Sequence, residues 1–444
     1  MSDSGERRDG EKEERLPRRA VLRGGLASFA AALMSRTLPG CGPGLAADGG
    51  MDGGGQPDLD AGRDGGPVDA GPVYFPPRDI PAPPALVSRI ADLGPLSADP
   101  DANGLRLPPG FTSRVVAKTG ELVEGTDYMW HVFPDGGACF LTEDGGWIYT
   151  SNSEMLAVGR ASGGVSALRF DASGDIVSAK GILTGTNVNC AGGLTPWHTW
   201  LSCEEVVRGQ VWETDPWGEH PAVARPALGV FKHEAVAVDP VNGHLYLTED
   251  ESDGCFYRFV PDALTPEGHP DLHAGRLEVA EVAADGAVTW HALPDPQFQG
   301  SEPCNAQVAA ATHFSGGEGI WYHAGVIYFS TKGDHHVRAY RVADARIDVI
   351  YDGSDTAGLH GVDNLTVSCC GDVLVAEDGG TMQVVAVLPD GTLKPIVQVI
   401  GHDGSEVTGP AFDPSGTRLY FSSQRGPGGG WTFEVTGPFH EPMP

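Results

Sequence analysis

One short pattern recurs along this chain and limits what the chain can fold into. A polar residue opens a segment rich in β-forming residues, and a second polar residue or pair closes it about fifteen positions later. The clear copies are Cys190 to Glu204-Glu205, Glu234 to Glu249-Asp250, Glu318 to Lys332, and Asp363-Asn364 to Glu377-Asp378. Two looser copies flank them, one ending at Asn152-Ser153-Glu154 and one running from Glu406 to Gln424-Arg425.

The spacing of tight turns within these copies predicts a β-propeller. Side chains alternate between the two faces of a strand, so equivalent strand ends aim equivalent side chains the same way. The last two intervals between turns are close to 45 residues, which is typical of propeller blades. We therefore predict an all-β, six-bladed β-propeller. A long excursion inside one blade spans Pro261 to Pro303, and a seventh blade hidden there is the alternative count.

The first part of the chain is predicted to direct export rather than to join the propeller. Residues 1–41 combine a charged leader, the pair Arg18-Arg19 and a short apolar run, which indicates a twin-arginine export signal. Residues 42–75 are rich in Gly and Asp and cannot bury a core, so we expect a disordered tether there. Residues 76–444 would then form the propeller.

The end of the signal resembles a lipid-attachment site. Leu38-Pro39-Gly40 precedes Cys41 as in a lipobox, so Cys41 is predicted to carry a lipid; plain cleavage nearby with an unmodified Cys41 is the alternative. A lipid followed by a tether indicates an exported periplasmic or cell-surface lipoprotein that meets the membrane only through this anchor. Twin-arginine export carries folded proteins, which suits a protein that acquires metal before it crosses.

The charge and the cysteines narrow the function further. A formal net charge of −31 argues against a nucleic-acid partner. Seven cysteines follow Cys41, and an odd number leaves at least one thiol unpaired. Cys190 is our candidate for a functional thiol because it alone opens a copy of the repeat. A disulfide with Cys203 or a buried free thiol is the alternative reading.

The carboxylates of the repeat would gather near one end of a central channel. Such packing raises carboxyl pKa values through burial and mutual repulsion, so bound cations are the natural compensation. Hard oxygen donors in this number suit calcium, and carboxylates with one thiolate could also hold iron. Any one of these acids alone could simply cap a turn or face solvent. The predicted set is Glu154, Glu204, Glu205, Glu234, Glu249, Glu318, Asp363, Glu377, Asp378 and Glu406.

Four of these segments resemble motifs of the PhoX-type alkaline phosphatases, a family with many relatives of unknown function. They are Asn189–Glu205, His233–Glu251, Gly361–Val367 and Glu406–Gln424, and the resemblance covers residues 100 to 435. It implies a six-bladed propeller that holds two ferric and three calcium ions and hydrolyses phosphate esters. No P-loop, dinucleotide fingerprint or nucleophile elbow stands where its mechanism would require it.

The resemblance also implies roles for individual residues. Cys190 resembles the iron-binding cysteine of the family, and Glu204 and Glu377 would support neighbouring ligands. The implied metal ligands are Cys190, Glu205, Glu234, Glu318, Asp363, Asp378, Glu406 and Glu154. The family places a phosphate-gripping arginine two residues before the glutamate matched by Glu318, whereas this chain has Gly316 there. Lys332 and Arg425 are the cations that could replace it, so the predicted catalytic residues are Glu318, Lys332 and Arg425.

Three functions remain open at this point. The first is metal-assisted hydrolysis of a small phosphate ester by a monomer that holds Ca²⁺ and Fe³⁺. The second is a calcium-dependent lactonase or esterase without iron. The third is a tethered, non-catalytic binding protein, which the missing arginine at Gly316 keeps open.

Overall fold

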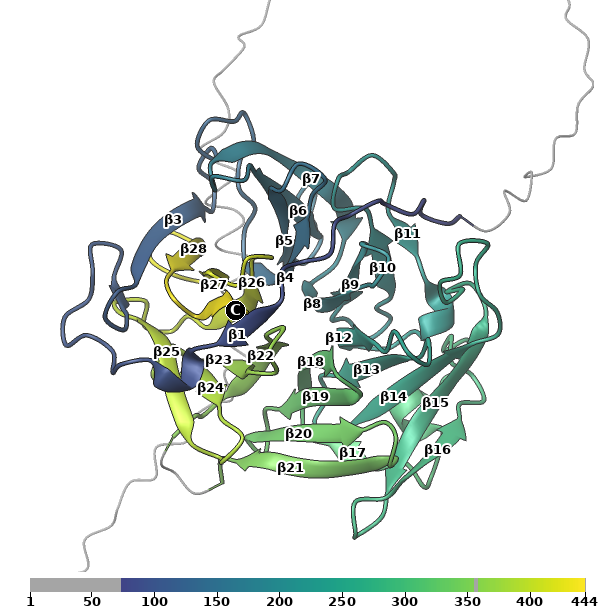
Figure 1. Ribbon diagram of the computed structural model, residues 1–444. Coiled ribbons are helices and arrows are strands. Elements are labelled where there is room, and N and C mark those ends of the chain that lie inside the picture. The colour runs from purple at the N-terminus through teal and green to yellow at the C-terminus, as the bar shows by residue number, and fades with distance from the viewer. Residues whose placement is uncertain (1–72, 355–357, 444) are drawn as a thin grey trace, which may run out of the picture. The chain divides into compact units, whose positions relative to one another are not determined.

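Six antiparallel sheets surround a common axis in the computed structural model, which describes residues 73–354 and 358–443 (Figure 1). The strands alternate with turns, and the described residues form only three short 3-10 helices. The predicted all-β, six-bladed propeller is thereby confirmed. The export signal, Cys41 and the tether up to residue 72 lie outside the described residues.

The first three blades run outward from the axis in chain order. Blade 1 contains β4 (Pro134–Leu141), β5 (Trp147–Ser153), β6 (Gly163–Phe170) and β7 (Ile176–Thr186). Blade 2 contains β8 (Asn189–Leu194), β9 (Trp200–Glu204), β10 (Val211–Thr214) and β11 (Val223–Ala224). Blade 3 contains β12 (His233–Val238), β13 (Leu245–Glu249), β14 (Gly254–Pro261), β15 (Gly275–Val282) and β16 (Val288–Ala292), with β17 (His313–Phe314) paired to β14.

The other three blades continue the ring and close it. Blade 4 contains β18 (Gly317–His323), β19 (Val326–Thr331), β20 (His336–Arg341) and β21 (Arg346–Asp352). Blade 5 contains β22 (Val362–Val367), β23 (Val373–Glu377), β24 (Gln383–Val387), β25 (Leu393–Val399) and β2 (Leu105–Arg106). Blade 6 contains β26 (Val407–Phe412), β27 (Arg418–Ser423), β28 (Trp431–Thr436) and β3 (Thr112–Lys118), so an early strand completes the last blade.

The long segment from Pro261 to Pro303 is an excursion of blade 3. It supplies β15 and β16, which add to the outer edge of the sheet that begins with β12. The described residues therefore hold six blades, and the alternative count of seven is wrong.

Aromatic side chains fill the spaces between blades. Phe256 of blade 3 stacks on Phe329 of blade 4 with ring centroids 4.6 Å apart, and Tyr149 of blade 1 stacks on Tyr420 of blade 6 at 5.0 Å. All four side chains are almost completely buried. Burial of one such ring contributes about 2–3 kcal/mol, so these contacts fix the angle between neighbouring blades.

Small residues let the inner strands approach one another closely. A Cβ atom on Gly193 of β8 would lie 1.8 Å from the Val236 carbonyl oxygen of β12, and one on Gly319 of β18 would lie 2.4 Å from the Leu365 nitrogen of β22. Both contacts are with backbone, which cannot move aside easily. The glycines therefore set the narrow width of the channel.

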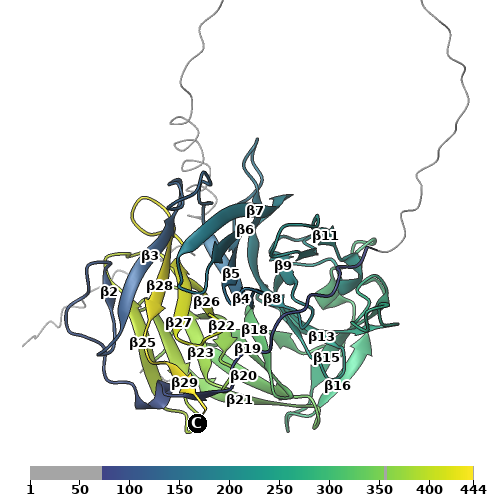
Figure 2. The same ribbon diagram turned by 45° about the horizontal axis from the view of Figure 1, so that its top comes forward.

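The segment from residue 73 to residue 89, here called the N-terminal strap, crosses one end of the channel (Figures 1 and 2). Its strand β1 (Leu86–Ser88) pairs with β29 (His440–Pro442) near the end of the chain. At its other end Arg78 binds Asp215 at 3.0 Å. The first described residues, Val73–Phe75, belong to the range assigned to the tether, and the Val73 carbonyl accepts a hydrogen bond from Arg225 at 2.9 Å.

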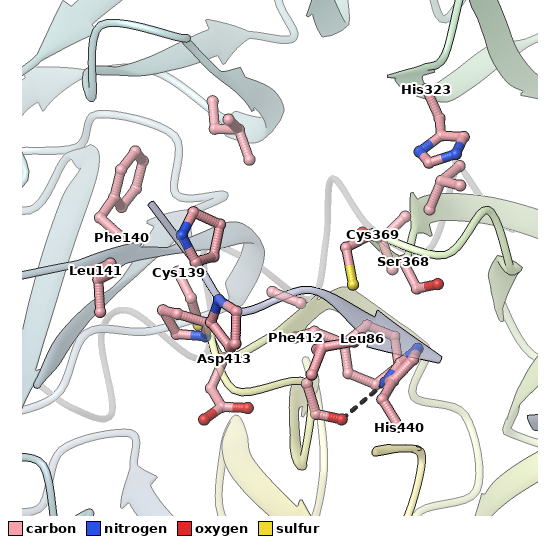
Figure 3. A pocket seen from close by; sticks show the side chains of 18 of the residues that line it. Leu86, Cys139, Phe140, Leu141, His323, Ser368, Cys369, Phe412, Asp413 and His440 are labelled. Carbon is pink, nitrogen blue, oxygen red and sulfur yellow. Dashed lines mark hydrogen bonds between the residues drawn. The ribbon is translucent and has the colours of Figure 1, made fainter. Parts of the chain in front are cut away.

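The strap covers an apolar cavity of about 400 Å³ at this end of the channel (Figure 3). The inner strands supply residues at their C-terminal ends, such as Phe140 and Phe412, and the strap supplies Pro81, Pro83 and Pro84. The opposite ends of the same inner strands carry the polar residues of the repeat, so the two ends of the channel differ in chemistry. No helix among the described residues is long and apolar enough to cross a membrane.

The close approach at Gly193 generates a stability prediction. Gly193→Ala should lower the free energy of unfolding by about 3 kcal/mol, because the added methyl group overlaps the Val236 carbonyl and must push two blades apart. Urea unfolding measures the change. Gly300→Ala is the matched control, since a Cβ at Gly300 meets only a carboxylate oxygen at 3.4 Å. Equal stability of the two variants would contradict the assigned role of Gly193.

Candidate metal centre

Each inner strand begins with a β-bulge, a shift in register against the second strand of its blade. A bulge leaves an extra residue unpaired and re-aims its side chain. Five bulges hold a residue with an ionisable side chain, namely Asp135, Cys190, Glu234, Glu318 and Asp363. The bulge of β26 holds Gly409-Pro410 instead, and Glu406 stands just before that strand.

A second set of polar side chains follows the second strand of each blade. They stand one or two residues beyond the paired end of that strand: Glu154, Glu205, Asp250, Lys332, Asp378, and the pair Gln424-Arg425. The two sets meet at one end of the channel. The name acid ring is used below for Asp135, Glu154, Cys190, Glu205, Glu234, Asp250, Glu318, Asp363, Asp378 and Glu406.

Three predicted members do not reach the ring. Where two acids are adjacent, the first points to the other side of the strand and binds its own hairpin. Glu204 accepts a hydrogen bond from the Trp212 indole at 3.1 Å. Glu249 accepts one from the Tyr257 hydroxyl at 2.6 Å, and Glu377 accepts one from Thr381 at 2.9 Å. The expectation that these three acids converge with the others is therefore wrong.

Two ring members were missed by the sequence prediction. Asp135 comes from the first, looser copy, in which no opening polar residue had been assigned. Asp250 was recognised as the end of a copy, but Glu249 was chosen from that pair. The signal for both was present, since Asp250 follows Glu234 by sixteen positions much as Glu205 follows Cys190 by fifteen.

Ring side chains lie close enough together to hold cations. Four groups each offer three ligand atoms within 4.8 Å of one another: Cys190, Glu205 and Glu234; Glu234, Glu318 and Asp363; Asp363, Asp378 and Glu406; and Asp135, Glu154 and Glu406. Consecutive groups share Glu234, Asp363 or Glu406, so cations in neighbouring groups would share a bridging carboxylate. All eight predicted metal ligands belong to these groups.

The fit to a metal also rests on an unsatisfied buried atom. Glu234 is 1% exposed, and its Oε2 atom has no hydrogen-bond partner among the described residues. Its Oε1 atom accepts a hydrogen bond from the Cys190 thiol at 3.0 Å. A buried carboxylate oxygen without a partner is costly, and a bound cation would remove that cost. The donor set of carboxylates and one thiol is compatible with calcium and with iron.

Three cationic side chains also contact the ring. Lys332 Nζ lies 3.1 Å from Glu318, 3.2 Å from Asp363 and 3.4 Å from Asp378. The Arg425 guanidinium lies 2.8 Å from Glu406 and 3.6 Å from Glu154. The third cation, Lys232, was not predicted; it binds Glu205 at 2.7 Å and Asp250 at 3.3 Å.

Burial dominates the ionisation of the ring. It raises the pKa of Glu234, Glu318 and Glu406 well above the usual range, and the neighbouring carboxylates add to the effect. Burial likewise raises the pKa of Glu205 to about 8, although Lys232 opposes the shift. The pKa of Asp378 is lowered instead: burial raises it, but Lys332, Arg425 and a hydrogen bond with Glu406 together outweigh burial. Without bound cations the ring therefore retains protons near neutral pH.

Neighbouring blades hold the bulges in place. Asn152 of blade 1 donates to the Cys190 carbonyl of blade 2 at 3.1 Å. Thr248 of blade 3 donates to the Glu318 carbonyl of blade 4 at 2.6 Å, and Ser330 of blade 4 donates to the Asp363 carbonyl of blade 5. These hydrogen bonds fix the backbone from which the ring side chains extend.

The candidate thiol lies inside the ring. Cys190 is 7% exposed, and burial raises the pKa of its thiol well above the usual value. Cys203 is also buried, and all seven cysteines in the described part of the chain are free. The structure therefore has no Cys190–Cys203 disulfide.

Gly316 stands beside the ring in a conformation that suits glycine. Its φ angle is +67°, and a Cβ atom there would lie 3.2 Å from Asp250 Oδ1 and 3.5 Å from Glu318 Oε1. A side chain at this position would enter the ring, but the left-handed backbone disfavours any residue with a Cβ atom. The backbone conformation at Gly316 therefore favours glycine over the arginine that the PhoX-type family places at this position.

Comparison with known proteins agrees with this fold. The family model of the alkaline phosphatase PhoX matches residues 147–216 and 208–348. The structure of Pseudomonas fluorescens PhoX in complex with vanadate, a transition state analogue, is 17% identical, with a TM-score of 0.64 over 78% of this chain and 98% of that chain. A gluconolactonase from Xanthomonas campestris is 14% identical, with a TM-score of 0.46 over 82% and 99%. No curated protein matches the chain in sequence.

The match to the family model confirms the resemblance to the PhoX-type family. The TM-score of the gluconolactonase is too low to bear on function. At 17% identity the PhoX structure itself shows a shared fold.

The raised carboxyl pKa values predict how the metal-free protein responds to pH. Glu205 has a folded pKa of about 8 against 4.5 in a free side chain, so its contribution to stability is complete below about pH 4.5 and is lost as pH rises to about 8. After treatment with a chelator, the melting temperature should therefore fall by several degrees across this range. Excess calcium should restore it at pH 8, because the cation replaces the bound protons. Scanning calorimetry tests both effects. A melting temperature that changes with neither pH nor added calcium would contradict the predicted metal centre.

Proposed function

We propose that this PhoX-like propeller is an exported, metal-dependent phosphoric ester hydrolase that acts on a small phosphomonoester. The observation that carries the proposal is the convergence of nine carboxylates and one thiol at one end of the channel, with cationic side chains among them. The match to the PhoX family model supports the same reaction class.

The proposed cofactors are calcium and iron. The carboxylates would hold Ca²⁺, and Cys190 with Glu205 and Glu234 would hold the softer iron. When bound, such ions neutralise phosphoryl oxygens and activate the attacking nucleophile. The chain therefore needs no serine or histidine nucleophile of its own.

Two of the cationic side chains that contact the acid ring, Lys332 and Arg425, are placed to receive a phosphate group. The side chains of Lys332 and Arg425 are 32% and 27% exposed, whereas their partners Glu318 and Glu406 are 1% and 8% exposed. The two cations are thus more accessible to a solute than the Glu318 and Glu406 carboxylates that they contact. Burial would lower the pKa of Lys332, but Asp363 and Glu318 raise it well above the usual value, so the ammonium stays charged at alkaline pH. Two charged donors could orient the phosphoryl oxygens for displacement.

The proposal predicts hydrolysis of a chromogenic phosphate monoester by protein expressed with calcium and iron. Glu318→Gln should lower kcat by about 100-fold or more, because the variant removes a carboxylate shared by a candidate metal group and Lys332. Glu281→Gln is the matched control, since Glu281 is half exposed and, within the described part of the chain, its carboxylate pairs with His291 on an outer strand. Equal rates for wild type and Glu318→Gln would remove the ring from the mechanism.

The other two functions are separated by assaying the same protein with lactones and by measuring its metal content. Turnover of a lactone by protein that contains calcium but no iron would favour the calcium-dependent lactonase. Metal-loaded protein that turns over neither phosphate esters nor lactones would favour the tethered binding protein, which Gly316 still permits.

We further propose that the mature protein is a lipoprotein anchored through Cys41. Its motif lies at the end of an export signal, and the chain between it and the propeller is rich in glycine. Detergent phase partitioning of the full chain should place the wild type in the detergent phase and Cys41→Ser in the aqueous phase. Aqueous partitioning of both would indicate plain cleavage.

A further inference from the structure

Lys332 occupies the space that two candidate metal groups share. It follows β19 directly, and its Nζ atom lies 3.1–3.4 Å from carboxylate oxygens of blades 4 and 5. Glu318 belongs to one candidate group, Asp378 belongs to the next, and Asp363 belongs to both. The ammonium group thus takes the place of a cation at the junction of the two groups.

A divalent cation and the ammonium group cannot both use these oxygens. Calcium binds oxygen at about 2.3–2.6 Å, so an ion on the oxygens that contact Nζ would lie within a few ångströms of the positive charge. Two like charges at this spacing repel strongly inside a protein. Metal binding on the Glu318 and Asp363 oxygens that contact Nζ therefore requires Lys332 to move.

The buried oxygen of Glu234 indicates that a cation other than Lys332 belongs here. Glu234 shares a candidate group with Glu318 and Asp363, and its Oε2 atom is buried without a hydrogen-bond partner among the described residues. Lys332 pairs with the other two acids and not with this one. Lys332 therefore compensates only part of the charge in the group.

Lys332 has room to leave the ring. Its side chain is 32% exposed, and the neighbouring Gly316 contributes no side chain beside the Lys332 Cβ atom. Lys232 differs, because its Nζ atom is also anchored on the Asp250 carbonyl at 2.7 Å. Lys332 is thus the lysine of the ring that is better placed to move.

We propose that Lys332 is a displaceable counter-ion that couples cation binding to anion binding. In the metal-free protein its ammonium group is paired with Glu318, Asp363 and Asp378. When divalent cations bind the ring, its ammonium group is released toward the channel opening, where it receives the phosphate of an anionic ligand. This inference rests on the proposed metal centre and adds a regulatory step to it.

The coupling has a thermodynamic signature. If calcium binding frees Lys332 for phosphate, then inorganic phosphate must tighten calcium binding by the same factor. Removing the ammonium group should tighten calcium binding without phosphate and abolish the effect of phosphate. Retaining the charge on a longer side chain should preserve the competition.

Calorimetric titration of chelator-treated, full-length protein with calcium tests the inference. Lys332→Met should bind calcium about tenfold more tightly than wild type, and inorganic phosphate should tighten calcium binding in wild type but not in Lys332→Met. Lys394→Met is the matched control, since it removes the same charge from β25, an outer strand of blade 5. Lys332→Arg should stay close to wild type. Circular dichroism of each variant shows that the propeller is folded.

The outcomes separate this inference from the proposed activity. Equal or weaker calcium binding by folded Lys332→Met would overturn the counter-ion role. The same result for Lys332→Met and Lys394→Met would overturn it too, because a general charge effect would then explain the gain. Tighter calcium binding by Lys332→Met, together with no phosphatase activity in the metal-loaded wild type, would support the counter-ion role and overturn the proposed hydrolysis.

Discussion

Repulsion between buried carboxylates at the channel axis is the constraint on which the rest of the molecule depends. Nine acids face one another there, and three lysine or arginine side chains offset part of their charge. Burial would otherwise drive these acids to bind protons, as the pKa of about 8 for Glu205 shows. The propeller around the acid ring must therefore hold these acids together against their mutual repulsion.

The scaffold resists that repulsion through its backbone. Bulges at the start of the inner strands direct side chains toward the axis. Thr248 and Ser330 donate hydrogen bonds to the bulge carbonyls of the neighbouring blade. Glycines such as Gly319 bring the strands close enough for acids of different blades to share one ion. Bulges and glycines would each weaken an ordinary sheet, and here both bring the acids together.

Much of this arrangement could be predicted from the sequence, because a strand period of two and a blade repeat near 45 residues fix which end of the channel each polar residue reaches. The prediction failed where two acids are adjacent. Glu249 and Asp250 point to opposite sides of one strand, and only the position of the strand end decides which of them enters the acid ring. Asp135 was missed because its copy of the repeat is irregular. The three carboxylates that Lys332 contacts depend on the radius of the channel, which no local pattern contains.

Closure of the last blade has a consequence for biogenesis. Ring acids come from blades at both ends of the chain, from Asp135 to Glu406, and blade 6 is complete only when β28 pairs with β3. A nascent polypeptide cannot assemble the centre until translation has passed Thr436, whatever metals surround it. The group of Cys190, Glu205 and Glu234 needs only blades 2 and 3, whereas both groups that contain Glu406 need blade 6. The complete set of cation sites therefore depends on closure of the circle.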